Sequence, residues 1–180
     1  MNVLRIVVIG KDYTGKSSLV CARPFDRAYS PTIGVDYVVS MVVRDGAEIS
    51  LAFWDLSGQG RFYPIVMSYV RDCSVIVFCY SAIDISSFRE IDEKYRGYLK
   101  YGHKEVILVA TKIDSPDVHP DYEKWGHDFS VLHKCSFVKT SSKTNEGVKE
   151  FFDLCSFFYL NPVKKKSRNC LLELFSRFNP

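Results

Sequence analysis

A glycine-rich segment near the N-terminus has the residue types and the spacing that bind phosphate. Residues 10–17 read Gly-Lys-Asp-Tyr-Thr-Gly-Lys-Ser, which is the pattern G-x-x-x-x-G-K-S. An apolar run at residues 3–9 precedes it and predicts a buried strand, and residues 16–21 can open a helix. In this context the pattern is a P-loop, whose backbone N–H groups and helix N-terminus converge on one anionic site. We expect Lys16 to reach the β- and γ-phosphates and the Ser17 hydroxyl to bind Mg²⁺, since the alternative, a chance loop, does not explain the flanking elements.

The composition is that of an ordinary globular protein. The 180 residues suffice for one α/β domain with a sizeable core, and a net charge of +3 is too small to indicate nucleic acid as a partner. The six cysteines include no C-x-x-C pair and several lie in apolar runs, so we expect small buried hydrophobic residues in a reducing compartment. No signal peptide or membrane span is visible. The sequence therefore predicts a soluble, intracellular chain.

Strands alternate with helices along the chain. Hydrophobic periodicity predicts strands at residues 3–9, 37–43, 49–56, 74–80, 106–110 and 135–139, and helices at 16–21, 62–71, 87–99, 122–132 and 148–159. The Asp-Gly pair at residues 45–46 predicts a hairpin between the second and third strands, and Ser87 with Glu90 has the spacing of a capping box. This order implies an α/β fold with a mostly parallel six-stranded sheet and helices on both faces. Such sheets bind ligands at the carboxyl ends of their strands.

Four further segments follow the P-loop in a fixed order. They are Ser-Pro-Thr-Ile-Gly-Val-Asp at 30–36, Trp-Asp-Leu-Ser-Gly-Gln at 54–59, Thr-Lys-Ile-Asp at 111–114 and Thr-Ser-Ser-Lys at 140–143. Together the five motifs resemble those of Ras-superfamily small GTPases, most closely the Rab branch, over roughly residues 3–160. The resemblance implies a P-loop NTPase G domain at residues 1–162, followed by a basic tail at residues 163–180.

The resemblance implies a guanine site in the last two motifs. Asp114 would accept hydrogen bonds from guanine N1–H and N2–H₂, whereas its alternative role is that of a turn or helix-cap carboxylate. Lys112 would lie over the base, Phe25 would stack on it from the edge, and the backbone N–H of Ser142 would reach guanine O6. The remaining contacts implied in these motifs come from Thr111, Ser141 and Lys143.

The resemblance also implies a magnesium shell and a hydrolytic centre. Thr32 would complete the Mg²⁺ shell begun by Ser17, and Asp55 would hold the metal through a water. The N–H of Gly58 would contact the γ-phosphate, and Gln59 would orient the attacking water, unless it is simply a solvated loop residue. The catalytic residues implied are Gln59 and Lys16. The phosphate-binding residues implied in the P-loop are Asp12, Tyr13, Thr14, Gly15, Lys16, Ser17 and Ser18.

Several residues depart from the family pattern. Asp12 places a carboxylate beside the γ-phosphate where small residues are usual, and Tyr13 is bulky where the loop needs a positive φ. We therefore hypothesise weak intrinsic hydrolysis and a poor response to an activating protein. Thr111 replaces the usual asparagine, so we expect the loss of an amide that ties this loop to the P-loop, with lower guanine affinity. Gly60 is expected to loosen the second switch.

The C-terminal segment lacks the family's usual lipid signal. Cys170 lies ten residues from the last residue of this sequence, so neither a C-a-a-X box nor a double-cysteine ending is present. A basic run at 164–168 precedes an apolar run at 171–178, which fits a linker with a short docked helix, a weak membrane contact, or the start of another domain. We expect a cytoplasmic protein, peripheral on endomembranes without a prenyl anchor.

These features predict a molecular switch that binds GTP and GDP with Mg²⁺ and acts in vesicle trafficking or signalling. Effectors, exchange factors and activating proteins would contact the loops around Thr32 and Gln59, and we expect a monomer that binds no nucleic acid. One alternative is a pseudo-GTPase that binds nucleotide without turnover, which Asp12 and Tyr13 favour. Another is an ATP-using P-loop kinase, which Asp114 disfavours because its carboxylate would meet an acceptor on adenine.

Overall fold

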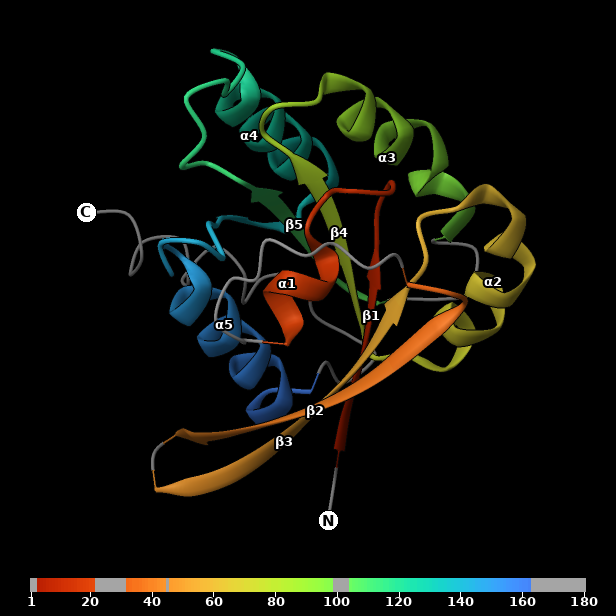
Figure 1. Ribbon diagram of the computed structural model, residues 1–180. Coiled ribbons are helices and arrows are strands. Elements are labelled where there is room, and N and C mark those ends of the chain that lie inside the picture. The colour runs from red at the N-terminus through yellow and green to blue at the C-terminus, as the bar shows by residue number, and fades with distance from the viewer. Residues whose placement is uncertain (1–2, 22–31, 45, 99–103, 163–180) are drawn as a thin grey trace.

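The chain forms one twisted sheet with helices on both faces. The computed structural model describes residues 3–21, 32–44, 46–98 and 104–162 (Figure 1). The strands are β1 (Val3–Ile9), β2 (Val35–Arg44), β3 (Ala47–Leu56), β4 (Val75–Ser81), β5 (Glu105–Thr111) and β6 (Ser136–Lys139). The helices are α1 (Lys16–Val20), the 3₁₀ turn η1 (Gly60–Phe62), α2 (Tyr63–Asp72), α3 (Ile85–Tyr98), α4 (Tyr122–His133) and α5 (Val148–Leu160).

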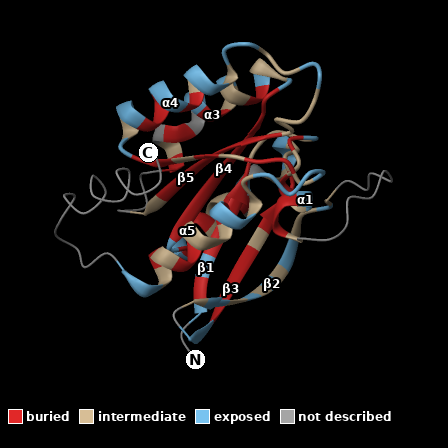
Figure 2. Cartoon of the chain, turned by 90° about the vertical axis from the view of Figure 1, so that its left-hand side faces the viewer, coloured by how far each residue is buried: buried red, intermediate tan, exposed pale blue. Residues whose placement is uncertain are grey.

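The sheet has the order β2-β3-β1-β4-β5-β6, in which only the β2–β3 pair is antiparallel. Helices α1 and α5 pack on one face, whereas α2, α3 and α4 pack on the other (Figure 1). All seven residues of β4 are buried, as expected for a strand that is covered on both faces (Figure 2). The predicted α/β fold with a mostly parallel six-stranded sheet is therefore confirmed.

The start of α3 differs from the prediction. The helix begins at Ile85, and Ser87 lies inside it rather than capping it. The Ser86 N–H donates to Asp84 Oδ1 at 2.9 Å, while Ser87 Oγ donates to the Asp84 carbonyl and accepts from the Ser81 N–H. The predicted capping box is wrong because Asp84, three residues before Ser87, supplies the acceptor that the first turn needs.

The cysteines behave as small hydrophobic residues. Cys73, Cys79, Cys135 and Cys155 are buried and form no disulfide. Burial raises the pKa of the Cys73 thiol to about 11 and that of the Cys79 thiol to about 12, so neither is a reactive thiolate at neutral pH. In the described part of the chain, no helix is both long enough and apolar enough to cross a bilayer.

Candidate nucleotide site

The P-loop joins the carboxyl end of β1 to α1 and has the backbone that a phosphate cradle needs. Gly15 has φ 86° and Tyr13 has φ 64°, so the loop passes through the left-handed region twice. A Cβ on Gly10 would lie 2.2 Å from the Cys79 carbonyl oxygen, so only glycine lets the loop approach β4. The prediction of a positive φ at Tyr13 is confirmed, and its side chain is 64% exposed.

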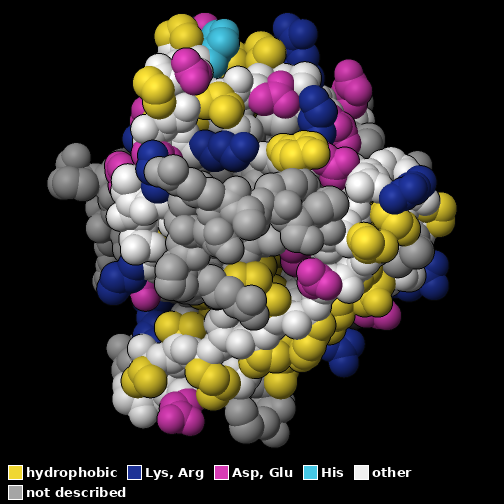
Figure 3. All heavy atoms as spheres, viewed as in Figure 1, with side chains coloured by type: hydrophobic (Ala, Val, Ile, Leu, Met, Phe, Trp, Pro, Cys, Tyr) yellow, Lys and Arg dark blue, Asp and Glu magenta, His cyan; other side chains and the backbone are white. Residues whose placement is uncertain are grey.

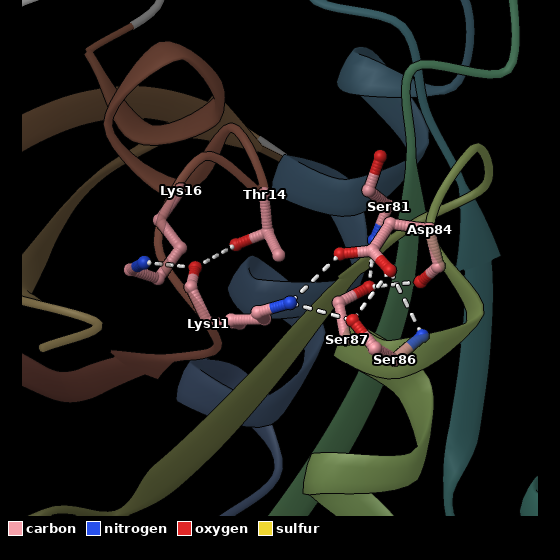
Figure 4. Close-up of polar contacts among 7 residues, drawn as sticks. All are labelled: Lys11, Thr14, Lys16, Ser81, Asp84, Ser86 and Ser87. Carbon is pink, nitrogen blue, oxygen red and sulfur yellow. Dashed lines mark hydrogen bonds and ion pairs between the residues drawn. The ribbon is translucent and has the colours of Figure 1, made fainter. Parts of the chain in front are cut away.

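The Lys16 side chain folds over this loop. Its Nζ donates to the carbonyl oxygens of Gly10 and Lys11, each at 2.9 Å, and the residue is 6% exposed. Burial lowers the pKa of the Lys16 ammonium, which the charge of Asp55 partly offsets. Thr14 Oγ1 donates to the Lys11 carbonyl at 2.8 Å and fixes the same turn (Figure 4). The Lys16 ammonium is thus held where phosphates are expected.

A second polar cluster, which the sequence did not predict, fastens the P-loop to α3. Lys11 Nζ donates to Ser86 Oγ at 2.5 Å and lies 3.2 Å from Asp84 Oδ2 (Figure 4). Burial acts to raise the pKa of the Asp84 carboxyl, but hydrogen bonds from Ser86 and Lys11 outweigh it and lower that pKa. No local pattern pairs residues 73 positions apart, so only the fold reveals this contact.

Three oxygen-bearing side chains converge beside Lys16. Ser17 Oγ donates to Asp55 Oδ2 at 2.5 Å, Thr32 Oγ1 lies 3.3 Å from the same oxygen, and the two hydroxyls are 3.2 Å apart. Asp55 is 1% exposed, and its other oxygen, Oδ1, is buried without a hydrogen-bond partner among the described residues. Burial raises the pKa of this carboxyl, although the Ser17 hydrogen bond and Lys16 oppose the shift.

This donor set fits a hard cation. A buried carboxylate oxygen without a partner is costly, and a bound cation would compensate it. The described residues contain no group of three or more His, Cys, Asp or Glu side chains that could hold a metal by themselves. One carboxylate with two hydroxyls is instead typical of Mg²⁺, which completes its shell with waters and substrate phosphates.

The loop after β3 contacts the P-loop backbone directly. A Cβ on Gly58 would lie 2.3 Å from Asp12 N and 2.6 Å from Asp12 Oδ1, so no other residue fits there. The Asp12 carboxylate therefore lies against the residue that precedes Gln59. Gln59 itself is half-buried, and its N–H donates to Ser57 Oγ at 3.3 Å. The structure thus brings Asp12 against Gly58, the residue before Gln59.

The loop that contains Thr32 is linked to the loop after β3. The Ser57 N–H donates to the Gly34 carbonyl oxygen at 2.9 Å, just before β2 begins. Thr32 Oγ1 and Asp55 Oδ2 form a second connection between the same two segments. The two segments that the sequence predicts to be switches are therefore coupled by backbone as well as side-chain contacts.

The carboxyl ends of β5 and β6 carry the second half of the site. Asp114 Oδ1 accepts a hydrogen bond from Ser141 Oγ at 2.6 Å, and Lys143 Nζ lies 3.6 Å from Oδ2. The hydrogen bond from Ser141 lowers the pKa of the Asp114 carboxyl, with a smaller effect from Lys143. Ser141 Oγ in turn accepts the N–H groups of Lys143 and Thr144, at 3.2 and 3.1 Å. Asp114 is thus an ionised, oriented acceptor.

Thr111 contradicts the expected loss of a contact with the P-loop. Its Oγ1 lies 2.5 Å from the Thr14 carbonyl oxygen and 3.0 Å from that of Tyr80, and the residue is buried. The hydroxyl donates into the P-loop, so the expected loss of this tie is wrong. Lys112 follows with φ 60° and is partly buried, which lowers the pKa of its ammonium.

For the other predicted site residues, we report only the element and the burial. Ser142 is half-buried in the loop after β6, and Ser18 is exposed in the first turn of α1. Phe25, the predicted base-stacking residue, lies outside the described residues.

Comparison with known proteins decides the family. Residues 5–157 match the model of the Ras family. The chain belongs to the Ras family. It is 34% identical to Ras-related protein Rab-18 of Caenorhabditis elegans over 159 residues, which is 85% of this chain and 78% of that relative. It is 32% identical to human Ras-related protein Rab-30 over 157 residues, which is 83% of this chain and 76% of that relative. This Ras-family chain is a Rab-like small GTPase, a hydrolase that binds guanine nucleotides.

Proposed function

We propose that this Ras-family protein is a slow molecular switch whose GTP- and Mg²⁺-bound state orders the loops at Thr32 and Gly58. The observation that carries the proposal is the convergence of Ser17, Thr32 and Asp55 from three separate segments within 3.3 Å. A site of this kind joins the P-loop to both switch segments. Loss of the γ-phosphate would release the two loops, so the conformation of the switch segments would depend on the bound nucleotide.

The magnesium ion would be held by Ser17 and Thr32 directly and by Asp55 through a water. When bound, Mg²⁺ neutralises charge that develops on the phosphates. Lys16 would turn its ammonium from the Gly10 and Lys11 carbonyls to the β- and γ-phosphates. Its low exposure supports this role, because a buried cation interacts more strongly with an anion than a solvated one.

The guanine base would be read by Asp114. The Ser141 hydrogen bond supports this role because it orients the carboxylate and keeps it ionised. Lys112 would cover the base, and the phosphates would lie on the backbone from Asp12 to Ser18. Because adenine offers an acceptor where guanine offers donors, the buried polar groups would be left unpaired with ATP.

Hydrolysis would depend on Gln59 and would be slowed by Asp12. The closeness of Gly58 to the Asp12 carboxylate supports this, since a negative charge there would face both the γ-phosphate and the attacking water. A positive φ at Tyr13 makes the same part of the loop strained for a bulky residue. We propose that both residues also hinder an activating protein.

The wider role follows from the Rab-like relatives. We propose that a G domain at residues 1–162 binds effectors, exchange factors and activating proteins through the two switch loops. The site of action would be the cytoplasmic surface of endomembranes, in vesicle trafficking. The basic tail at 163–180 would add at most a weak membrane contact.

Competition between nucleotides tests the guanine site. The purified chain should bind a fluorescent GDP analogue with Mg²⁺, and GDP should displace it about 10⁴–10⁵-fold more effectively than ADP. Asp114→Ala should remove most of this preference, whereas Asp117→Ala, at an exposed position three residues on, should retain it. Equal displacement by ADP in the wild type would contradict the proposal.

A further inference from the structure

The outer edge of β2 is ten residues long, and no described residue pairs with it. In the described part of the chain, β2 pairs only with β3, and the register runs without a bulge from Val35 to Arg44. The strand contains no proline and no lysine. Natural edge strands are usually short, bulged, or protected by such residues against pairing with another chain. The opposite edge, β6, follows this rule, since it has four residues and ends in Lys139.

One face of β2 also carries an exposed apolar stripe. Tyr37, Val39, Met41 and Val43 alternate along the strand and are 59%, 48%, 54% and 70% exposed. In the space-filling view a diagonal band of hydrophobic side chains follows β2 (Figure 3). The residues between them point the other way, and Val38 and Val42 pack against the core under α5. Tyr37 contacts the Trp54 ring and Met41 Sδ accepts from Ser50 Oγ, yet about half or more of each side chain in the stripe stays exposed.

The two charged residues of β2 stand at positions that complement each other. Asp36 is exposed near the start of the strand, and Arg44 is half-buried at its end. Asp36 and Arg44 share one face of the strand because they are an even number of residues apart. They lie an odd number of residues from each member of the stripe, so their face is the opposite one. Arg44 Nη1 donates to the Asp153 carbonyl oxygen on α5, which leaves most of its five N–H donors for other acceptors.

We propose that the β2 edge pairs with the β2 edge of a second copy of this chain. The two strands would be antiparallel about a two-fold axis that is perpendicular to the sheet and passes at Ser40. In this register Asp36 of each copy lies opposite Arg44 of the other, so opposite charges meet at both ends. Between them the same register places Tyr37 opposite Val43 and Val39 opposite Met41.

Other registers lose this match. An axis at Val39 places Asp36 opposite Val42, and an axis at Met41 places Arg44 opposite Val38. Only the Ser40 register joins two charge pairs, two sets of apolar pairs and the free backbone edges of both strands. The result is a closed, symmetric dimer with one continuous sheet, since an isologous contact uses the same surface twice. This dimer replaces the monomer that the sequence suggested, and it does not depend on the nucleotide chemistry proposed above.

Sedimentation velocity on the full chain, loaded with GDP and Mg²⁺ across the micromolar range, tests the dimer. The wild type should show a reversible monomer–dimer equilibrium. Asp36→Arg and Arg44→Asp should each raise the dissociation constant about tenfold or more, because each places like charges opposite each other at both ends. The matched control is Glu48→Arg on β3, an exposed charge reversal one strand in from the edge, which should leave the equilibrium unchanged.

A mixture of the two single variants separates a lost interface from a damaged fold. In a mixed dimer, arginine at 36 faces aspartate at 44, and Arg44 of the first copy faces Asp36 of the second, so both charge pairs return. The mixture should therefore dimerise as the wild type does, although neither variant does so alone. A wild type that stays monomeric at every concentration, or a mixture that fails to regain dimers, would overturn the proposal.

Discussion

Asp12 and Gly58 show how closely the P-loop and the second switch fit. The backbone N–H and one carboxylate oxygen of Asp12 occupy the space that any side chain at position 58 would need. The close approach explains why residue 58 is glycine. It also places a negative charge next to the residue that precedes Gln59, which is why we expect hydrolysis to be slow.

Substitution of this glycine gives a sharp test. Gly58→Ala would place a Cβ 2.3 Å from Asp12 N and 2.5 Å from the carbonyl carbon of Lys11, neither of which can turn aside. The loop must then move, and we expect the single-turnover rate of GTP hydrolysis to fall about 10²-fold. Gly60→Ala is the matched control, since no atom lies within 4 Å of its new Cβ, and its rate should be unchanged. Equal rates for Gly58→Ala and the wild type would show that this contact is unimportant.

The sequence predicted the site residues well where the chemistry fixes both residue type and order. Ser17, Thr32 and Asp55 meet as expected because each follows or precedes a readable strand or helix. The cluster of Lys11, Asp84 and Ser86 could not be predicted, since ordinary surface residue types far apart in the chain carry no local signal. Thr111 was misjudged because the pattern records residue type, whereas the contact depends on where a hydroxyl points.

At the scale of elements, the loop after β5 holds the P-loop in place. The Thr111 hydroxyl donates to the buried carbonyl oxygen of Thr14 and lies 3.0 Å from that of Tyr80, so two elements meet at this side chain. Loss of this donor would leave an acceptor without a partner in a buried setting, which costs more than the hydrogen bond itself contributes.

Thr111→Val keeps the shape of the side chain and removes only the donor. We expect the free energy of unfolding in urea to fall by about 1–3 kcal/mol, and bound GDP to dissociate faster. Thr111→Ser keeps the hydroxyl and should lose clearly less stability. If valine proves as stable as threonine, the tie between the loops does not contribute to stability.

Element boundaries were predictable where apolar runs end at polar or glycine residues. β1 and the β2–β3 hairpin are confirmed within two residues, whereas α3 begins earlier than predicted because Asp84 takes the capping role. The exposed face of β2 could not be predicted. Valine occupies both faces of that strand, so hydrophobicity alone does not tell the covered side from the uncovered one.

At the scale of the whole molecule, the described sheet divides into two functional parts. The carboxyl ends of β1, β3, β5 and β6 carry the candidate nucleotide site, whereas the β2 edge is the surface proposed for a second copy. β2 begins three residues after Thr32, so both parts adjoin the first switch loop. We propose that the protein with these two parts is a working but slow GTP switch.

Single-turnover hydrolysis of GTP by the wild type, Asp12→Gly and Gln59→Leu tests that claim most directly. We expect slow hydrolysis in the wild type and a rate about tenfold higher or more in Asp12→Gly, which corresponds to about 1.4 kcal/mol at the transition state. Gln59→Leu should abolish turnover while it retains nucleotide binding. Tight guanine nucleotide binding without hydrolysis in either the wild type or Asp12→Gly would contradict the account and make the protein a binding module.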